Sequence, residues 1–328
     1  MNSYQNFIIF KTDAIFNSHV SFKGVGGKEL VVDPNFDPAR HMRTYGEVVS
    51  IPLHLGTHPI TQETKGTPPD PQKPFEYRFM RDIEQDVRIS DKIYFHFNVM
   101  RTGKPIKTEG THPNKTFWFP CSYDNVICTV RDKEIIMIGS YVLCYPDMES
   151  WEDILVPIYS DIKDAEGNPI LKPKDQWLQR KVRPEAKFLK AFVKHVGKPL
   201  KGDTCEVEVG QRIWYRRNAD WINTVEGVDY FAIRQRHIIG KEVNGKFEPV
   251  RDYMLVIPEE EPEQTKSGIY IKKKLTSRGE VFHPGKSNFE KGLRVMFGYS
   301  DRQELELEGK KYLLIKKGDV FATKTKAA

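Results

Sequence analysis

The sequence contains no run of 18 apolar residues, so it predicts no transmembrane helix. The four cysteines form no C-x-x-C pair, which in a chain of 328 residues predicts buried reduced thiols and argues against a disulfide framework. They are Cys121, Cys128, Cys144 and Cys205. The first residues lack the basic start and long apolar core of a secretory signal. From these absences we expect a cytoplasmic protein.

Motifs for nucleotide and metal chemistry are also scarce. The sequence has no P-loop, and its nearest approach to a dinucleotide fingerprint, at 24–27, precedes no helical pattern. His54 and His58 have a ligand-like spacing, but they lie in a proline-rich segment without cysteine support. We therefore expect no catalytic residue, no metal site and no cofactor held by the chain itself.

The net charge of +6 is mild and evenly spread. Its 51 basic residues are interleaved with 45 acidic ones, and the one dense basic run is at 272–274. This pattern is typical of a solvated surface and disfavours a phosphate-tracking stripe for nucleic acid. The five tryptophans stand at strand positions, so core packing explains them better than base stacking.

Short strand patterns dominate what is present, most clearly from 251 to 324. An apolar run at 253–257 is closed by Pro258, which cannot donate to a strand ladder. Further strand patterns follow at 278–282, 293–297 and 312–315, separated by glycine-bearing turns and without a helical period. This region predicts a small, partly open β-barrel.

The same order of signals recurs twice before this region. A strand after a loop lies at 45–49, 190–194 and 278–282. A turn with a small residue, then a basic residue and an apolar strand, lies at 87–95, 207–215 and 289–297. A third signal lies at 130–135, 233–238 and 315–320, and an opening strand at 7–10, 154–158 and 254–258. Any β-rich protein gives such runs, but the shared order favours tandem repeats.

The spacing of these signals sets the predicted domains. From the second signal to the third, Ile213 to Ile233 and Val295 to Ile315 are both 20 residues, whereas Ile93 to Val130 is 37, which indicates about 17 inserted residues. We predict an all-β chain of three tandem barrels at 1–146, 150–243 and 247–328, with linkers at 145–149 and 243–247. The first barrel carries loop insertions at about 53–82 and 101–117, which are rich in proline and glycine.

The third region resembles a GroES-type co-chaperonin subunit, the lid of a GroEL-type chaperonin ring. The resemblance covers 252–322 and rests on five motifs in order: an opening strand that ends in acidic residues, TKSGIYI at 265–271, RGEV at 278–281, GLRVMF at 292–297 and GDVFA at 318–322. One departure is Tyr270, which stands inside a tripeptide that is usually all aliphatic in the family.

The resemblance implies a partner-binding mobile loop, a GroEL-type chaperonin as partner, and self-assembly into a ring. In that family ATP is bound and hydrolysed by the chaperonin, not by its lid. The predicted binding residues are Ser267, Gly268, Ile269, Tyr270 and Ile271. By position, candidate anchors in the other two loops are Leu30, Val31, Val32, Ile170 and Leu171, which ordinary hairpin packing explains equally well.

Two alternatives stay open at this point. The same barrels occur in zinc-dependent dehydrogenases, but these require the nucleotide-binding domain that the motifs above do not support. A structural or assembly protein, for instance of a virus, could also reuse the barrels without capping a chaperonin. The divergence of the first two repeats favours this second alternative, and the loop around Ile269 favours the lid.

Overall fold

The structure is a computed structural model that describes residues 7–16, 22–23, 29–30, 42–52, 58–59, 77–78, 86–111, 114–157, 159–163, 169–174, 178–199, 205–259, 277–298 and 303–324. Strands dominate this part of the chain. One α-helix, α2 (Asn98–Thr102), is described, with short 3₁₀ turns at η1 (Tyr123–Asn125), η2 (Met148–Ser150), η4 (Gln235–His237) and η5 (Lys317–Asp319). The all-β prediction is confirmed.

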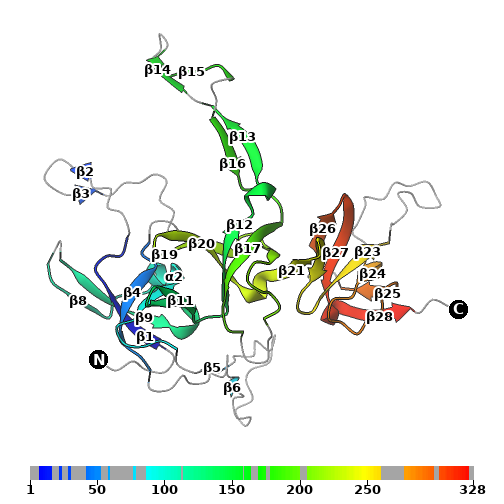
Figure 1. Ribbon diagram of the computed structural model, residues 1–328, viewed down its shortest axis with the longest axis horizontal. Helices are drawn as coiled ribbons and strands as arrows, with labels where there is room; N and C mark the ends of the chain where they lie inside the picture. Colours follow the sequence, from blue (N-terminus) through cyan, green and yellow to red (C-terminus); the bar gives the residue numbers. More distant parts are fainter. Residues whose placement is uncertain are drawn as a thin grey trace. The chain divides into compact units, whose positions relative to one another are not determined.

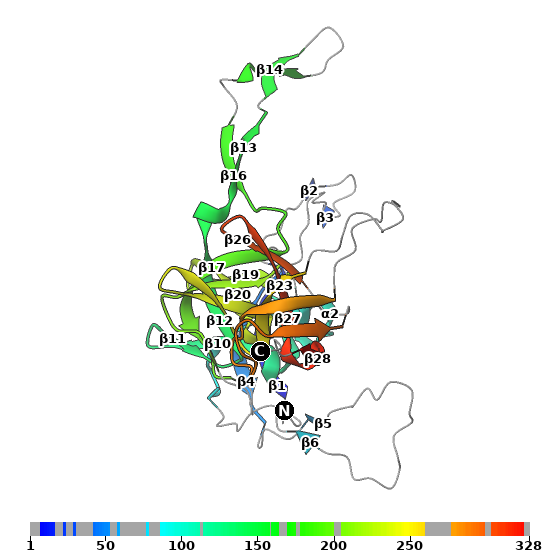
Figure 2. The same cartoon turned by 90° about the vertical axis from the view of Figure 1, so that its right-hand side faces the viewer.

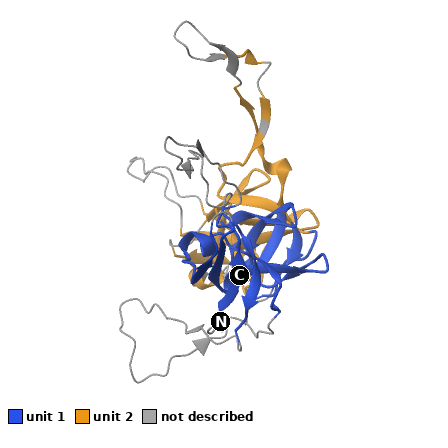
Figure 3. Cartoon of the chain, turned by 90° about the vertical axis from the view of Figure 1, so that its left-hand side faces the viewer, with its two compact units in different colours: residues 1–144, 193–210, 219–237 blue, residues 145–192, 211–218, 238–328 orange. Residues whose placement is uncertain are grey.

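The chain divides into two compact units (Figure 3). Unit 1 comprises residues 1–144, 193–210 and 219–237, and unit 2 comprises residues 145–192, 211–218 and 238–328. Both unit boundaries near 144 and 192 fall inside strands, so the second sheet described below contributes to both units.

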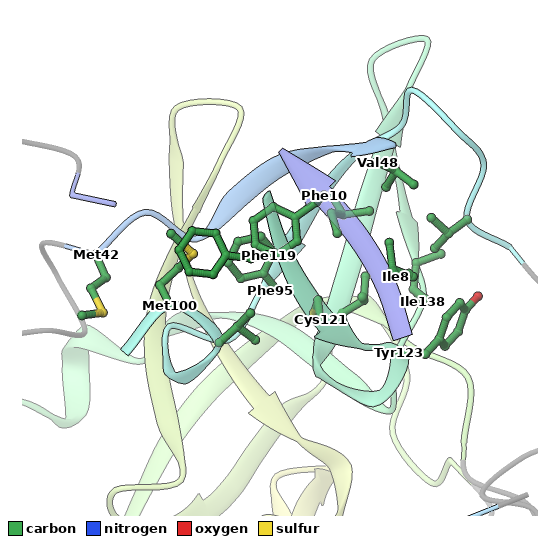
Figure 4. Close-up of a cluster of buried hydrophobic side chains, with 14 residues drawn as sticks. Ile8, Phe10, Met42, Val48, Phe95, Met100, Phe119, Cys121, Tyr123 and Ile138 are labelled. Carbon is green, nitrogen blue, oxygen red and sulfur yellow. The ribbon is translucent and has the colours of Figure 1, made fainter. Parts of the chain in front are cut away.

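The first sheet is antiparallel and has the strand order β11-β10-β7-β4-β1-β9-β8. Figure 1 labels β1, β4, β8, β9 and β11 of this sheet. Its strands are β1 (Phe7–Thr12), β4 (Tyr45–Ser50), β7 (Lys92–Phe95), β8 (Lys107–Glu109), β9 (Thr116–Ser122), β10 (Val126–Arg131) and β11 (Glu134–Met137). Figure 4 shows its core, where Phe10 lies with its ring centroid 4.4 Å from that of Phe95 and 5.9 Å from that of Phe119. Such tilted and stacked aromatic pairs fill the core of the first sheet.

The second sheet has the order β19-β20-β12-β17-β18-β21-β22. Its strands are β12 (Tyr141–Pro146), β17 (Phe188–Val196), β18 (Arg212–Arg216), β19 (Asp220–Val225), β20 (Val228–Arg234), β21 (Ile238–Val243) and β22 (Lys246–Pro249). The third sheet has the order β26-β27-β23-β24-β25-β28. Its strands are β23 (Tyr253–Pro258), β24 (Arg278–His283), β25 (Arg294–Phe297), β26 (Gln303–Leu307), β27 (Lys310–Lys316) and β28 (Val320–Lys324).

The three sheets share one topology. If the strands of each sheet are numbered in chain order, the first sheet has the spatial order 7-6-3-2-1-5-4. The second sheet has the same order when it is listed from its other end, and the third has this order without strand 7. In each, an opening strand (β1, β12 or β23) lies between the second strand (β4, β17 or β24) and a later hairpin strand (β9, β20 or β27). A 3₁₀ turn then precedes β10, β21 or β28.

The turn before the third strand of each sheet repeats in atomic detail. Ser90, Gly210 and Gly292 have φ angles of 70°, 88° and 86°, in the left-handed region that favours glycine. Their backbone N–H groups donate to the carbonyl oxygens of Val48, Val193 and Val281 respectively, each at 2.8 Å. The second sequence signal therefore marks a turn that requires this backbone conformation.

The opening strands are buried on both faces. Along β23, Met254 and Val256 enter the interior of the third sheet, whereas Tyr253 and Leu255 join a second buried cluster with Trp214. Because successive side chains point to opposite faces, a strand buried on both reads as one continuous apolar run.

The predicted opening strand of the second repeat, at 154–158, is wrong. β13 (Glu152–Val156) pairs with β16 (Leu178–Val182) in a sheet of two strands, and β12 takes the central place instead. Both segments are apolar and end near a proline, so composition did not separate them. Burial does, because β12 is buried from Tyr141 to Cys144 and β13 is exposed.

Two further predictions differ from the structure. The predicted third signal of the first repeat, 130–135, is the turn of the hairpin β10–β11, where Asp132 and Lys133 have φ of 49° and 68°. The equivalent 3₁₀ turn is η1, so the inserted stretch is shorter than predicted. The predicted linker at 243–247 is likewise a tight turn within the hairpin β21–β22. The domain limits themselves stay a prediction.

The predicted insertions are described only in part. Residues 104–111 are mostly exposed and include β8, consistent with a surface segment. Of the stretch 53–82, the structure describes β5 (His58–Pro59) paired with β6 (Tyr77–Arg78). Outside the predicted insertions, another short pair joins β2 (Phe22–Lys23) to β3 (Glu29–Leu30).

Candidate functional site

The three connections between the opening strand and the second strand are the candidate binding elements. They span 13–44, 147–187 and 259–277. The structure places Leu30 in β3 and Ile170 and Leu171 in β15 (Pro169–Leu171). The other predicted binding residues, Val31, Val32, Ser267, Gly268, Ile269, Tyr270 and Ile271, lie outside the described residues, so their role stays a prediction.

The second connection contains an arm, which we define by its described residues 152–157, 159–163, 169–174 and 178–182. Its stem is the ladder of β13 with β16, paired from Glu152↔Val182 to Val156↔Leu178. β14 (Tyr159–Lys163) pairs with β15 beyond the stem. Figures 1 and 2 both show β13 beside β16, and Figure 1 shows β14 and β15 beyond one end of this ladder.

One face of the stem is mainly apolar. Directly paired residues of an antiparallel ladder point to the same face, so Ile154, Val156, Leu178 and Val182 share one face with Glu152 and Arg180. Ile154 is 39% exposed and Leu178 is 58% exposed. None of the described clusters of buried apolar side chains includes a residue of the arm. We name Ile154, Val156, Leu178 and Val182 the stem face.

The opposite face of the stem has a different character. It carries Asp153 and Lys181, whose charged atoms lie 3.7 Å apart, together with Leu155 opposite Gln179. Leu155 is 54% exposed, and beyond the stem Leu171 is 46% exposed. The arm therefore combines a water-facing charged side with an apolar side that lacks cover from the described part of the chain.

The foot of the arm is fixed by a buried ion pair. Asp147 directly follows β12, its side chain is fully buried, and Arg212 Nε donates to its Oδ2 at 2.8 Å. The backbone N–H of Asp147 donates to the carbonyl of Lys190 on β17, and its carbonyl accepts from Ser150 N–H and Oγ–H. Partial burial acts to lower the pKa of Arg212, but the hydrogen bonds and charge of Asp147 raise it. Asp147 thus links the chain directly after β12 to β17 and β18, beside the base of the arm.

A related pair stands at the foot of each of the other two connections. In the third sheet, Glu259 N–H donates to the carbonyl of Arg278, and the Glu259 carboxylate lies 3.9 Å from Arg294 Nε. In the first sheet, Asp13 directly follows β1 and pairs with Arg43. We call Asp13–Arg43, Asp147–Arg212 and Glu259–Arg294 the foot pairs. Sequence reasoning missed them, although an acidic residue directly after each opening strand was the available signal.

A surface hollow of about 660 Å³ in unit 1 offers a different kind of site. Lys11, Glu47, Lys92 and Trp118 line it from four neighbouring strands. Lys11 Nζ lies 2.9 Å from Glu47 Oε1, and Lys92 Nζ lies 2.8 Å from Glu226 Oε1. These cations already have carboxylate partners, so the hollow offers a ligand little uncompensated charge.

Three of the four cysteine thiols are poorly suited to nucleophilic chemistry. Cys121, Cys128 and Cys144 are buried. Burial raises the pKa of Cys128 to about 12, and it also raises the pKa values of Cys121 and Cys144. A thiol with such a pKa is protonated at neutral pH, whereas the thiolate is the reactive form. The described residues contain no group of three or more His, Cys, Asp or Glu placed to hold a metal ion. Nor does this part of the chain hold a helix with the length and apolar character to cross a bilayer.

Comparison with known proteins singles out the third sheet. The family model for the chaperonin 10 kDa subunit matches residues 246–324, from the start of β22 to the end of β28. A co-chaperonin GroES from Gemmatimonas aurantiaca is 32% identical over 92 residues, which cover 24% of this chain and 95% of that protein. Nearly a whole GroES subunit is therefore aligned with one part of this chain. Through this region, the chain belongs to the chaperonin 10 family.

Proposed function

We propose that this chain is a co-chaperonin that caps a GroEL-type chaperonin ring and assists ATP-dependent protein folding. The observation that carries the proposal is the chaperonin 10 match at 246–324, which takes in every strand of the third sheet. The matched relative is itself named a co-chaperonin. A chain of this kind needs no reaction centre of its own, because the partner binds and hydrolyses ATP.

We also propose that the three sheets are tandem copies of this module. Their common strand order, the left-handed turns at Ser90, Gly210 and Gly292, and the three equivalent hydrogen bonds of 2.8 Å support this reading. The opening strands would then be β1, β12 and β23. Each copy would present the connection that follows its opening strand.

The third connection would bind through Ile269 and Ile271, with Ser267 and Gly268 before them and Tyr270 between them. Burying each isoleucine would contribute about 1.5–3 kcal/mol. Fixing the backbone costs about 1–2 kcal/mol per residue, so one loop alone binds weakly. Several weak loops on one assembly bind tightly together and release together when the partner changes shape. Leu30, Val31, Val32, Ile170 and Leu171 are the candidate anchors in the other two connections.

The direct test mixes the purified chain with GroEL-type rings and ATP, followed by co-sedimentation and imaging of side views. We expect density capping the end of the ring. The variant Ile269→Ser/Ile271→Ser should lower co-sedimentation at least 10-fold, since it removes both aliphatic anchors. Ile89→Ser is the matched control, because Ile89 is 59% exposed and lies outside the three connections.

Two outcomes would redirect the proposal. If the wild-type chain never binds the ring, a structural or assembly role becomes the better account. If it binds but Ile269→Ser/Ile271→Ser binds equally well, the cap stands and the third connection loses its role.

A further inference from the structure

We propose that the stem face of the arm, Ile154, Val156, Leu178 and Val182, is a second, pre-ordered docking surface for the same partner ring. This inference rests on the proposed function. It differs from the predicted loop contacts, because these four residues belong to a paired ladder and none was a predicted anchor.

The register of the stem gives the surface its shape. Val156 faces Leu178 directly across the ladder, and Ile154 and Val182 lie along the same face. Side chains project from the plane that contains the backbone hydrogen bonds, so a partner can pack on this face without disturbing the ladder. Position 180, directly opposite Ile154 in the ladder, is an arginine, and Glu152 pairs with Val182, so the sequence places one charge of each sign on this face and no net charge to attract a polyanion.

The stem is ordered before any partner arrives. Five successive residue pairs already hold β13 against β16, and the Asp147–Arg212 foot pair holds the start of the arm. A binding element ordered in advance loses less conformational entropy on docking than a loop that must fold on its partner. The arm would therefore bind more firmly than its few apolar side chains suggest.

The size of the surface selects its occupant. Four side chains that are only partly exposed present on the order of a few hundred Å². A stable pairing with a second copy needs about 1,200 Å² or more. A surface this small is sufficient where several contacts act together, as when the arm and the third connection engage one ring.

The test compares two apolar truncations on opposite faces of one stem. Ile154→Ser/Leu178→Ser alters the stem face, and Leu155→Ser removes an equally exposed leucine from the charged face. We expect the first variant to dissociate from GroEL-type rings with ATP at least 10-fold faster than wild type, and the second to match wild type. Wild type and Ile269→Ser/Ile271→Ser are measured alongside, so a failure of the proposed function is seen separately from a failure of this inference.

A chemical-labelling experiment tests the stem face without depending on whether the serine variants fold. Leu178→Cys is made in a Cys205→Ser background, because Cys205 is only partly buried whereas Cys121, Cys128 and Cys144 are buried. The protein is folded first and then modified with a charged thiol reagent, which should block binding because position 178 is exposed. Unchanged dissociation in both experiments would overturn the inference. So would a fall in the mass of the isolated protein for Ile154→Ser/Leu178→Ser, which would assign the stem face to self-association.

Discussion

A glycine near the start of the second strand in the first and third sheets permits close approach to the opening strand. A Cβ added at Gly46 would lie 2.9 Å from the carbonyl oxygen of Lys11, and one at Gly279 would lie 2.5 Å from that of Ile257. Real Cβ atoms do not come this close to backbone. These positions therefore require glycine for the strands to remain paired.

We expect Gly279→Ala to lower the free energy of unfolding by about 1–3 kcal/mol, the usual cost of overpacking a close-packed interior. Chemical denaturation monitored by tryptophan fluorescence measures this change. Gly318→Ala is the control, because no atom lies within 4 Å of its added Cβ and its φ is not positive. Equal stability of the two variants would contradict the close approach.

His96 makes stability depend on pH. Its ring centroid lies 3.9 Å from that of Trp221, and its Nδ1 accepts a hydrogen bond of 3.0 Å from Asn98 N–H. Burial, followed by the charges of Arg234 and Arg101, lowers the pKa of His96 from 6.5 to about 4. Between these values the unfolded chain binds a proton that the folded protein does not, so stability falls as pH drops through the window.

The loss attributable to His96 should reach about 3 kcal/mol at the acidic end of that window. Denaturation midpoints from pH 7 to pH 4.5 test this, with His96→Gln giving a shallower slope than wild type. A residual slope is expected from His195 and His283, whose pKa values are also lowered, mainly by burial. The same slope in wild type and His96→Gln would refute the assignment.

At the scale of the element, the foot pairs offer a matched comparison. Asp147 is fully buried, so Asp147→Asn leaves the Arg212 guanidinium without its main partner and should cost about 3–5 kcal/mol. The same change should raise hydrogen exchange across the arm more than across β23–β28. Hydrogen exchange by mass spectrometry resolves the two regions.

Glu259→Gln is the control for that comparison. Glu259 and Arg294 are both about half exposed, and their closest charged atoms are 3.9 Å apart. A surface pair of this kind contributes under about 1 kcal/mol. If Asp147→Asn and Glu259→Gln had equal effects on stability, burial of the foot pair would not be the source of its strength.

Much of this element order could be predicted from the sequence. The turn with Ser90, Gly210 or Gly292 was visible because a left-handed backbone leaves a small residue before a basic one. β23 was visible because burial on both faces leaves an uninterrupted apolar run ended by Pro258. The chaperonin 10 resemblance of the third region was confirmed by the family match.

The arm could not be predicted in the same way. β12 and β13 both show apolar runs, and only pairing over long sequence distances decides which one enters the sheet. The acidic residue after β12 is visible in the sequence, but its partner Arg212 lies 65 residues further on, so no local pattern shows which arginine Asp147 contacts. The residues predicted to bind a partner, including Ile269 and Ile271, remain predictions.

At the scale of the whole chain, three sheets are divided between two compact units because neighbouring sheets share buried clusters. In unit 1, Tyr94 and Ile127 of the first sheet region pack with Tyr141 and Leu143 of β12. In unit 2, Trp214 and Phe247 of the second sheet pack with Tyr253 and Leu255 of β23. The second sheet is thus shared, and its neighbours are joined to it by apolar packing and not by free linkers.

The stem face and the third connection belong to one chain, which predicts how substitutions in both combine in their effect on dissociation from the ring. If the stem face and the third connection both engage the ring, each raises the effective concentration of the other at its site. The affinity of two linked sites commonly exceeds that of either site alone by a factor of about 10²–10⁴. Ile154→Ser/Leu178→Ser and Ile269→Ser/Ile271→Ser should each convert slow dissociation into fast dissociation, and the four-residue variant should show no measurable binding. Biolayer interferometry on immobilised GroEL-type rings with ATP measures these rates. Should the four-residue variant dissociate no faster than Ile269→Ser/Ile271→Ser, the chain binds through the third connection without help from the arm.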